Sequence, residues 1–179
     1  MTSAGTGISH SEYNRNNSDQ VHFLQIWVQP SETRLAPKYY ARQFADEEKK
    51  DKLAKIVAPV SSEDSGVVDE REGGGPVPIH APVSVYACIL SPARTVEHSF
   101  PAPALGERLR KAYVHVIQTS GYNAKNARSK SEGGARVIVN GGLELGEGDG
   151  AFAMAGAGDK LEIENIGEGN AEFLVFDIE

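Results

Sequence analysis

The chain has 179 residues, 40% hydrophobic and 24% charged, which is typical of a globular protein with one domain and room for a second small one. Its formal net charge of −7 excludes a general nucleic-acid binder, because such proteins carry a basic surface. The sequence contains no apolar run of about 18 residues and no signal-peptide pattern at its N-terminus, so we expect no membrane contact and no secretion. A cytoplasmic or nuclear location is the expectation.

The first part of the chain is expected to be extended and to lead into a short helix. In GTGISHSEYN (5–14), His10 and Glu12 lie two residues apart, and on a strand both side chains would point to the same face. Residues 21–30 predict a strand ending at a proline, and residues 37–44 an extended segment. Residues 45–57 are the best helix candidate because acids precede lysines, although 53–59 could equally form a strand.

The remainder predicts short strands separated by turn residues. The segments expected to hold them are 78–92, 94–101, 111–121, 136–142, 143–156 and 160–179, with an acidic loop at 61–78 and a polar loop at 122–135. About nine to eleven strands with turns roughly every 8–12 residues predict an all-β barrel or double-sheet sandwich. The single cysteine, Cys88, lies in the apolar run VSVYACIL and is expected to be a buried thiol.

Several motifs in the chain resemble those of one family. MTSAGTGISHSEYN resembles the pirin-family stretch M-T-A-G-x-G-I-x-H-S-E, VHFLQIWVQP resembles H-x-x-Q-I-W, and PKYYARQF resembles P-x-Y-x-x-x-x-F. The part from VHVIQTSG to LVFDIE is similar to the second cupin of these proteins, which has an N-G turn, G-D-G-A and a closing L-L-F-D strand. The resemblance implies a cupin (double-stranded β-helix) fold. It divides the chain into a complete C-terminal cupin at 55–179 and a remnant of an N-terminal cupin at 1–45, as in a pirin shortened at its N-terminus.

The resemblance also implies a metal site. Pirin-like proteins hold one metal, usually iron, on three histidines and a glutamate, and His10 and Glu12 match the last two of these ligands. Some members act as quercetin 2,3-dioxygenases, in which the glutamate, here Glu12, also serves as the base that takes the substrate's hydroxyl proton. The first two ligands come from an H-x-H motif, and this chain has none, since its histidines are at 10, 22, 80, 98 and 115. Iron or another divalent transition metal is therefore expected only if other groups complete the site.

The sequence is compatible with two functions. One is metal-dependent oxygenation of a flavonol-like small molecule, impaired or absent because half of the ligand set is missing. The other is a non-catalytic binding module, like the members of the family described as nuclear transcription cofactors, with a protein partner or a second copy docking on residues 21–44. His22 is expected to be a packed histidine with a hydrogen-bonded ring, with a role as a surrogate ligand as the alternative. A metal in the second cupin is not expected at His80, His98 or His115.

Overall fold

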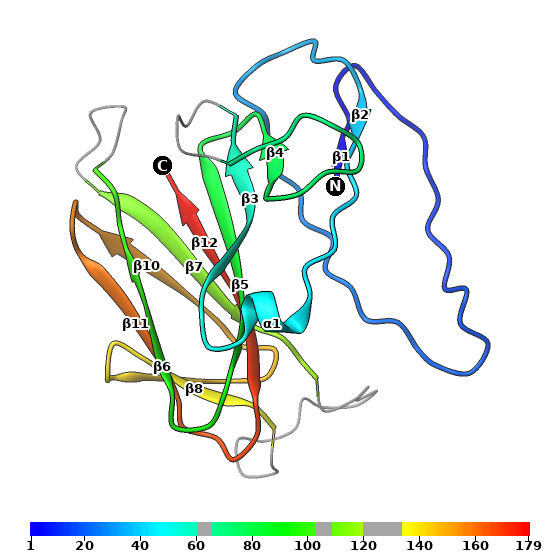
Figure 1. Ribbon diagram of the computed structural model, residues 1–179. Coiled ribbons are helices and arrows are strands. Elements are labelled where there is room, and N and C mark those ends of the chain that lie inside the picture. Colours follow the sequence, from blue (N-terminus) through cyan, green and yellow to red (C-terminus); the bar gives the residue numbers. More distant parts are fainter. Residues whose placement is uncertain (61–65, 103–108, 120–133) are drawn as a thin grey trace.

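The computed structural model describes residues 1–60, 66–102, 109–119 and 134–179, and within them two β-sheets face each other (Figure 1). Six strands form one sheet in the order β10-β7-β12-β5-β3-β4, and four form the other in the order β6-β11-β8-β9. The strands are β3 (Ala54–Pro59), β4 (Val77–Ile79), β5 (Val83–Leu90), β6 (Thr95–Ser99), β7 (Arg110–Val116), β8 (Arg136–Val139), β9 (Leu143–Gly146), β10 (Gly150–Ala155), β11 (Lys160–Asn165) and β12 (Ala171–Ile178). This arrangement confirms the predicted all-β double-sheet architecture.

The N-terminal part of the chain carries only short elements. Strands β1 (Thr2–Ser3) and β2 (Lys38–Tyr39) pair with each other, and the helix α1 (Asp46–Lys49) is a single turn. The chain between β1 and β2 makes a long excursion, and part of it loops away from the two sheets (Figure 1). No helix in the described parts of the chain has the length and apolar character needed to cross a membrane.

Strand β12 lies at the centre of the large sheet. It pairs antiparallel with β5 on one side and with β7 on the other, so that Phe176 is opposite both Val85 and Tyr113. Strands β3 and β4 pair in parallel, whereas the other strand pairs of the two sheets are antiparallel. Within the described ranges, β10 and β4 form the two edges of the large sheet.

The hydrophobic core lies between the sheets and follows from alternation along the strands. In β11, Leu161, Ile163 and Asn165 are buried while the residues between them are exposed. From the large sheet, Phe173 and Leu90 are fully buried against them. Cys88 belongs to the same core and is 1% exposed, which confirms the buried thiol. Burying each large apolar side chain stabilises the fold by about 1.5–3 kcal/mol.

The opposite face of the large sheet, called here the outer face, is also apolar. Val83 and Val85 of β5 and Leu174 and Phe176 of β12 form a second cluster there, because alternate residues of a strand point to opposite faces. Residues 22–31, called here the strap, cross this face. The strap is bound at one end by His22 and at the other by Ser31, and Val28 packs on the cluster between them.

The strap corrects one prediction, since residues 21–30 form no strand. Within them Val28 faces the sheet, while its neighbour Trp27 is 87% exposed. The strap lies over a sheet face rather than beside a strand edge, however, so its backbone has no neighbouring strand to pair with. The helix predicted at 45–57 is also too long. Residues from Ala54 onward form β3, the alternative reading of that segment, because they pair with β5. Residues 61–65 of the acidic loop and 122–133 of the polar loop lie outside the described residues.

Candidate functional site

The predicted ligands His10 and Glu12 lie in the N-terminal excursion. The segment around them forms no strand, so the expected placement on one strand face is wrong. The two side chains are nevertheless neighbours, with 3.9 Å between His10 Nε2 and Glu12 Oε1. Both are about half exposed, at 51% and 55%. The pair is therefore close enough to share one ion but is held by no surrounding structure.

These two residues do not fit a catalytic metal centre by themselves. Transition-metal sites in enzymes usually use three or more protein ligands in a fixed geometry. Among the residues that the structure describes, no three His, Cys, Asp or Glu side chains lie close enough together to hold one ion. Among the described residues, no buried hydrogen-bond partner fixes the orientation of the imidazole or the carboxylate, as surrounding groups do in metal sites.

The other four histidines are dispersed over the molecule. His22 Nδ1 lies 3.1 Å from the carbonyl oxygen of Gln118, so the ring is hydrogen-bonded as predicted, but the residue is exposed rather than packed. His115 lies close enough to His22 for their charges to interact, and burial together with that interaction lowers the pKa of His115. His80 Nδ1 lies 3.3 Å from Glu32. None of these three is placed beside His10.

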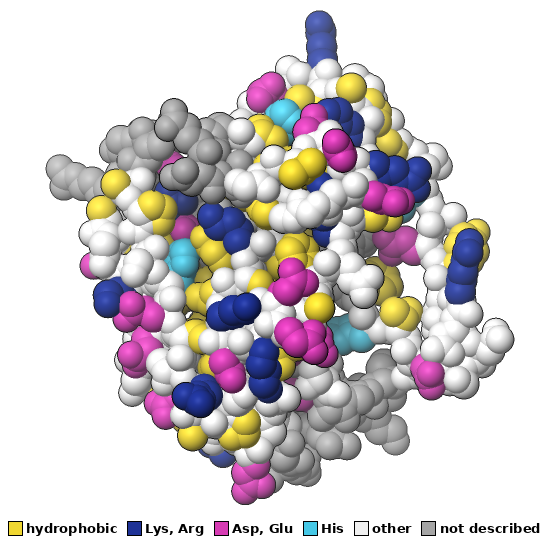
Figure 2. All heavy atoms as spheres, viewed as in Figure 1, with side chains coloured by type: hydrophobic (Ala, Val, Ile, Leu, Met, Phe, Trp, Pro, Cys, Tyr) yellow, Lys and Arg dark blue, Asp and Glu magenta, His cyan; other side chains and the backbone are white. Residues whose placement is uncertain are grey.

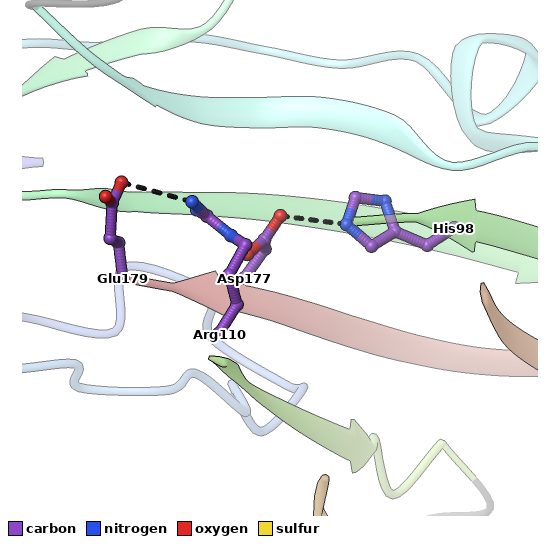
Figure 3. Close-up of polar contacts among 4 residues, drawn as sticks. All are labelled: His98, Arg110, Asp177 and Glu179. Carbon is purple, nitrogen blue, oxygen red and sulfur yellow. Dashed lines mark hydrogen bonds and ion pairs between the residues drawn. The ribbon is translucent and has the colours of Figure 1, made fainter. Parts of the chain in front are cut away.

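A cluster of charged side chains is buried at one end of the core, and it was not predicted from the sequence (Figure 3). Asp177 of β12 is at its centre and is 2% exposed. It accepts one hydrogen bond from His98 Nε2 at 2.9 Å and one from Arg110 Nε at 2.7 Å. The other end of the guanidinium donates to Glu179 at 3.1 Å. The four side chains come from β6, β7 and the end of β12.

The electrostatics of this cluster depend on the balance between burial and pairing. Burial alone would raise the pKa of Asp177, but the hydrogen bonds from His98 and Arg110 and the positive charge of Arg110 hold that pKa below its ordinary value. Burial would also lower the pKa of Arg110, and its contacts with Asp177 and Glu179 raise it instead. Burial and the charge of Asp177 raise the pKa of the neighbouring Tyr86. The carboxylate and the guanidinium therefore stay charged inside the fold.

The cluster is built to hold strands together rather than to bind a solute. The side chains of His98, Arg110, Asp177 and Glu179 are at most 9% exposed, so a substrate cannot reach them without opening the sandwich. The ring of His98 is enclosed between Tyr86 and Phe100, with centroid distances of 4.8 and 4.9 Å. We assign this cluster a structural role in joining β6, β7 and β12.

The sequence did carry a signal for the cluster. Arg110 continues the inward-facing series of Ala112 and Val114 on β7, and Asp177 continues that of Phe173 and Val175 on β12. Strand alternation therefore places both charges inside, and a buried charge requires a partner. The sequence did not show which of these side chains pair with each other. Arg110 and His98 are 67 and 79 positions away from Asp177 in the chain.

The outer face contains a hollow of about 280 Å³ between the sheet and the segment around α1. Its lining is mostly apolar, with Ile56, Ala87 and Leu174 from the outer face, and Lys49 and Glu172 are its charged members. Figure 2 shows hydrophobic side chains in the recess between the N-terminal excursion and the body of the molecule. No histidine contributes to the lining of this hollow, so it does not unite the predicted ligands.

Known proteins share sequence with different parts of the chain, although no family model matches it. A quercetin 2,3-dioxygenase from Escherichia coli strain K12 is 48% identical over 44 residues, which are 25% of this chain and 19% of that protein. A Zymomonas mobilis protein named "Putative quercetin 2,3-dioxygenase" is 35% identical over 98 residues, 55% of this chain and 37% of its own length. A Mycobacterium bovis protein of the same name is 28% identical over 147 residues, 82% of this chain and 47% of its own length. The chain thus spans less than half of each relative.

Solved structures agree on the architecture. The crystal structure of YhhW from Escherichia coli has a TM-score of 0.56 and 18% identity, covering 86% of this chain and 48% of that one. The complex of the bacterial pirin YhhW with nickel(II) has a TM-score of 0.50 and 19% identity, covering 83% and 47%. The chain is thus similar in sequence to pirin-like proteins and shares the fold of the bacterial pirin YhhW. The two stacked sheets form a cupin barrel, as the sequence resemblance implied.

The similarity to a metal-binding protein bears on the predicted ligands. Nickel is bound by the bacterial pirin YhhW. In this chain, the described residues supply His10 and Glu12 as a neighbouring pair and no third ligand beside them. Both predicted ligands lie in the N-terminal excursion, whereas the buried charge cluster lies in the two-sheet barrel.

Proposed function

We propose that this chain is a cupin of the metal-dependent quercetin 2,3-dioxygenase lineage in which catalysis is impaired or absent. The observation that carries the proposal is the state of the predicted ligand pair. His10 and Glu12 are 3.9 Å apart and half exposed, and the described residues bring no third ligand to them. Iron or another divalent transition metal would be held firmly only if further groups completed the set.

The relatives named as quercetin 2,3-dioxygenases support this lineage. A flavonol-like compound is the first small molecule to test, because it is the substrate class in those names. An open two-ligand site would not hold such a molecule in one orientation, since productive chemistry requires fixed positions of the reacting groups.

Metal content and oxygen consumption test this proposal together. The purified and dialysed chain would be analysed for bound transition metals beside His10→Ala and, as a control away from the pair, His80→Ala. Oxygen uptake with quercetin would then be followed after iron or nickel is added. We expect no retained metal and no quercetin-dependent uptake in any of the three proteins. About one metal ion per chain, lost in His10→Ala and kept in His80→Ala, together with uptake, would overturn the proposal.

The second candidate function is a non-catalytic module that binds a protein through residues 21–44. The exposed aromatic residues of this segment support it: Trp27 is 87% exposed, Phe23 57% and Tyr39 54%. Aromatic side chains are the residues that most often anchor protein interfaces. Large apolar side chains that are exposed together usually mark a surface that another molecule covers.

Fluorescence offers a direct test because Trp27 is the single tryptophan. A partner recovered by affinity capture would be purified and titrated into the chain while Trp27 emission is recorded. Docking on residues 21–44 should shift the emission to shorter wavelengths, and Phe23→Ser should weaken binding. Phe152→Ser is the matched control, since Phe152 is an exposed phenylalanine, at 82% against 57% for Phe23, but lies on β10. Equal weakening by both substitutions would exclude the segment as the binding site.

A further inference from the structure

Strand β10 forms one edge of the six-stranded sheet and carries no feature that would prevent it from pairing with another chain. Its residues, Gly150–Ala155, read GAFAMA, without a charge or a proline. Its register with β7 is unbroken from end to end, so no bulge turns it away. Within the described residues it pairs with β7 alone. Natural edge strands usually carry lysine, proline or a bulge because an open apolar edge recruits further strands.

The outward side of this edge strand bears two large apolar side chains. Phe152 is 82% exposed and Met154 64% exposed. The ring of Phe152 is held in place, since its centroid lies 4.7 Å from that of Tyr113, which lies 5.9 Å from Phe176. These three residues are direct cross-strand partners, and they form an aromatic row over β10, β7 and β12. The row ends at the open edge.

Gly150 makes room for this row. A Cβ atom at Gly150 would lie 2.1 Å from the hydroxyl oxygen of Tyr113, so the Tyr113 ring leans over the glycine. A glycine in a strand often marks such a close approach, and an aromatic ring that covers it compensates for the missing side chain. The ring of Phe152 therefore rests on a packed support and presents its remaining surface outward.

We propose that β10 pairs with β10 of a second copy of this chain and joins the two large sheets across a two-fold axis. In a closed two-fold dimer the same surface meets itself, so the two strands run antiparallel. With the axis at Phe152, this residue faces its own copy, Ala151 faces Ala153 of the second copy, and Gly150 faces Met154. An axis at Phe152 pairs five of the six β10 residues and, unlike an axis at Ala153, sets the exposed Phe152 ring opposite its own copy.

The composition of β10 favours a second copy over an unrelated peptide. At the two ends of this register a small side chain opposes a large one, because Gly150 of each copy faces Met154 of the other. No like charges meet, since the strand has none. The aromatic row of one copy also continues into that of the other through the two Phe152 rings, which is a favourable cross-strand pair.

The expected dimer is weak and depends on concentration. Phe152 leaves roughly 150 Å² of side-chain surface to be buried. A stable interface buries about 800 Å² on each partner, so these side chains alone fall well short. Most of the association must come from the backbone ladder along one short strand. We therefore expect a reversible equilibrium between monomer and dimer rather than a permanent assembly.

Cysteine cross-linking tests the register. Directly opposed residues of an antiparallel pair have Cα atoms about 4.5–5.5 Å apart, within reach of a disulfide. Phe152→Cys should therefore cross-link into a dimer under mild oxidation. Met154→Cys is the matched control, because it is exposed on the same face but would lie about 13 Å from its copy. Native Cys88 is 1% exposed and should not interfere. Cross-linking of Met154→Cys as fast as that of Phe152→Cys, or of neither, would overturn the pairing.

Sedimentation of the unmodified chain tests the dimer itself. We expect the average mass to rise with concentration, and Phe152→Lys should raise the dissociation constant at least about tenfold. Trp27→Lys is the control, since it removes an equally exposed aromatic residue of the strap. Circular dichroism would establish that both variants are folded. A monomer at all concentrations, or an equal loss in Trp27→Lys, would refute the role of β10. The second result would instead assign self-association to residues 21–44.

Discussion

Replacing Asp177 by asparagine removes the negative charge at the centre of the buried cluster while changing the side-chain volume little. Arg110 would keep Glu179 as its remaining ionic partner. One of the two donors that now point at the carboxylate, Arg110 Nε and His98 Nε2, would face a side-chain NH₂ group. His98 can adapt by exchanging tautomers, whereas the guanidinium has donors only. The interaction that this substitution removes is therefore the ion pair between Arg110 and Asp177.

The magnitude follows from the burial of that pair. Removing one partner of a buried ion pair destabilises a protein by about 3–5 kcal/mol when the other charge has no alternative. Because Glu179 stays 3.1 Å from Arg110, we expect a loss of about 2–3 kcal/mol in the free energy of unfolding at neutral pH. The matched control is Glu97→Gln, which removes an exposed carboxylate 2.9 Å from Lys160. It should change the free energy of unfolding by less than about 1 kcal/mol.

The effect should also depend on pH in a defined direction. The pKa of Asp177 is lowered in the folded chain. A carboxyl group of this kind stabilises the fold above its pKa in the unfolded chain, which is about 3.9, and loses that contribution as the pH falls through its folded-state pKa. The difference between the unmodified chain and Asp177→Asn should therefore be complete at about pH 5 and above, and it should shrink below about pH 4.

Urea unfolding followed by circular dichroism would measure these differences from neutral to acidic pH. The slopes of the free energy against urea should be equal for the compared proteins, since otherwise the two-state comparison does not hold. The reasoning is refuted if Asp177→Asn is as stable as the unmodified chain at neutral pH. It is also refuted if the difference is the same at about pH 3 as at about pH 7.

Three further substitutions or modifications have clear expected outcomes. His10→Ala should change the thermal unfolding temperature by no more than about 1–2 °C, because His10 is exposed and unsupported; a large drop would mean that the excursion is part of the fold. Asn165→Leu should lower the free energy of unfolding, measured in urea, by about 3 kcal/mol. The reason is that the Asn165 side-chain amide donates at 2.8 Å to the carbonyl oxygens of both Leu90 and Gly169, and an unchanged free energy would contradict a stabilising role of these hydrogen bonds. Burial raises the pKa of the Cys88 thiol to about 12, so a thiol reagent should label it at neutral pH only after unfolding, and rapid labelling of the native chain would show that the core opens.

Alternation of apolar residues was enough to predict the sheets. Residues 94–101, 111–121 and 160–179 hold β6, β7, β11 and β12, because each of these segments buries every second side chain in the core. The same signal misled at residues 21–30. An extended segment that packs one side on a sheet face alternates in the same way as a strand, and sequence alone does not show whether a pairing edge is available.

The candidate site was predictable only in part. The structure places His10 and Glu12 3.9 Å apart, although not on the strand from which their proximity was predicted. Their exposure does not follow from their spacing, because it depends on which other segments cover the excursion. For the buried cluster, strand alternation could have placed Arg110 and Asp177 inside. The meeting of these two side chains is a property of the β7 and β12 register, which the local sequence does not encode.

The central position of β12 constrains the order in which this barrel can form during synthesis. Residues 171–178 are made after β5 and β7 and are the strand that connects them. Until they leave the ribosome, the inner edges of β5 and β7 have no partner strand and the core residues of both face water. Because contacts between distant parts of a chain also form slowly, this intermediate should persist long enough to need protection by a chaperone.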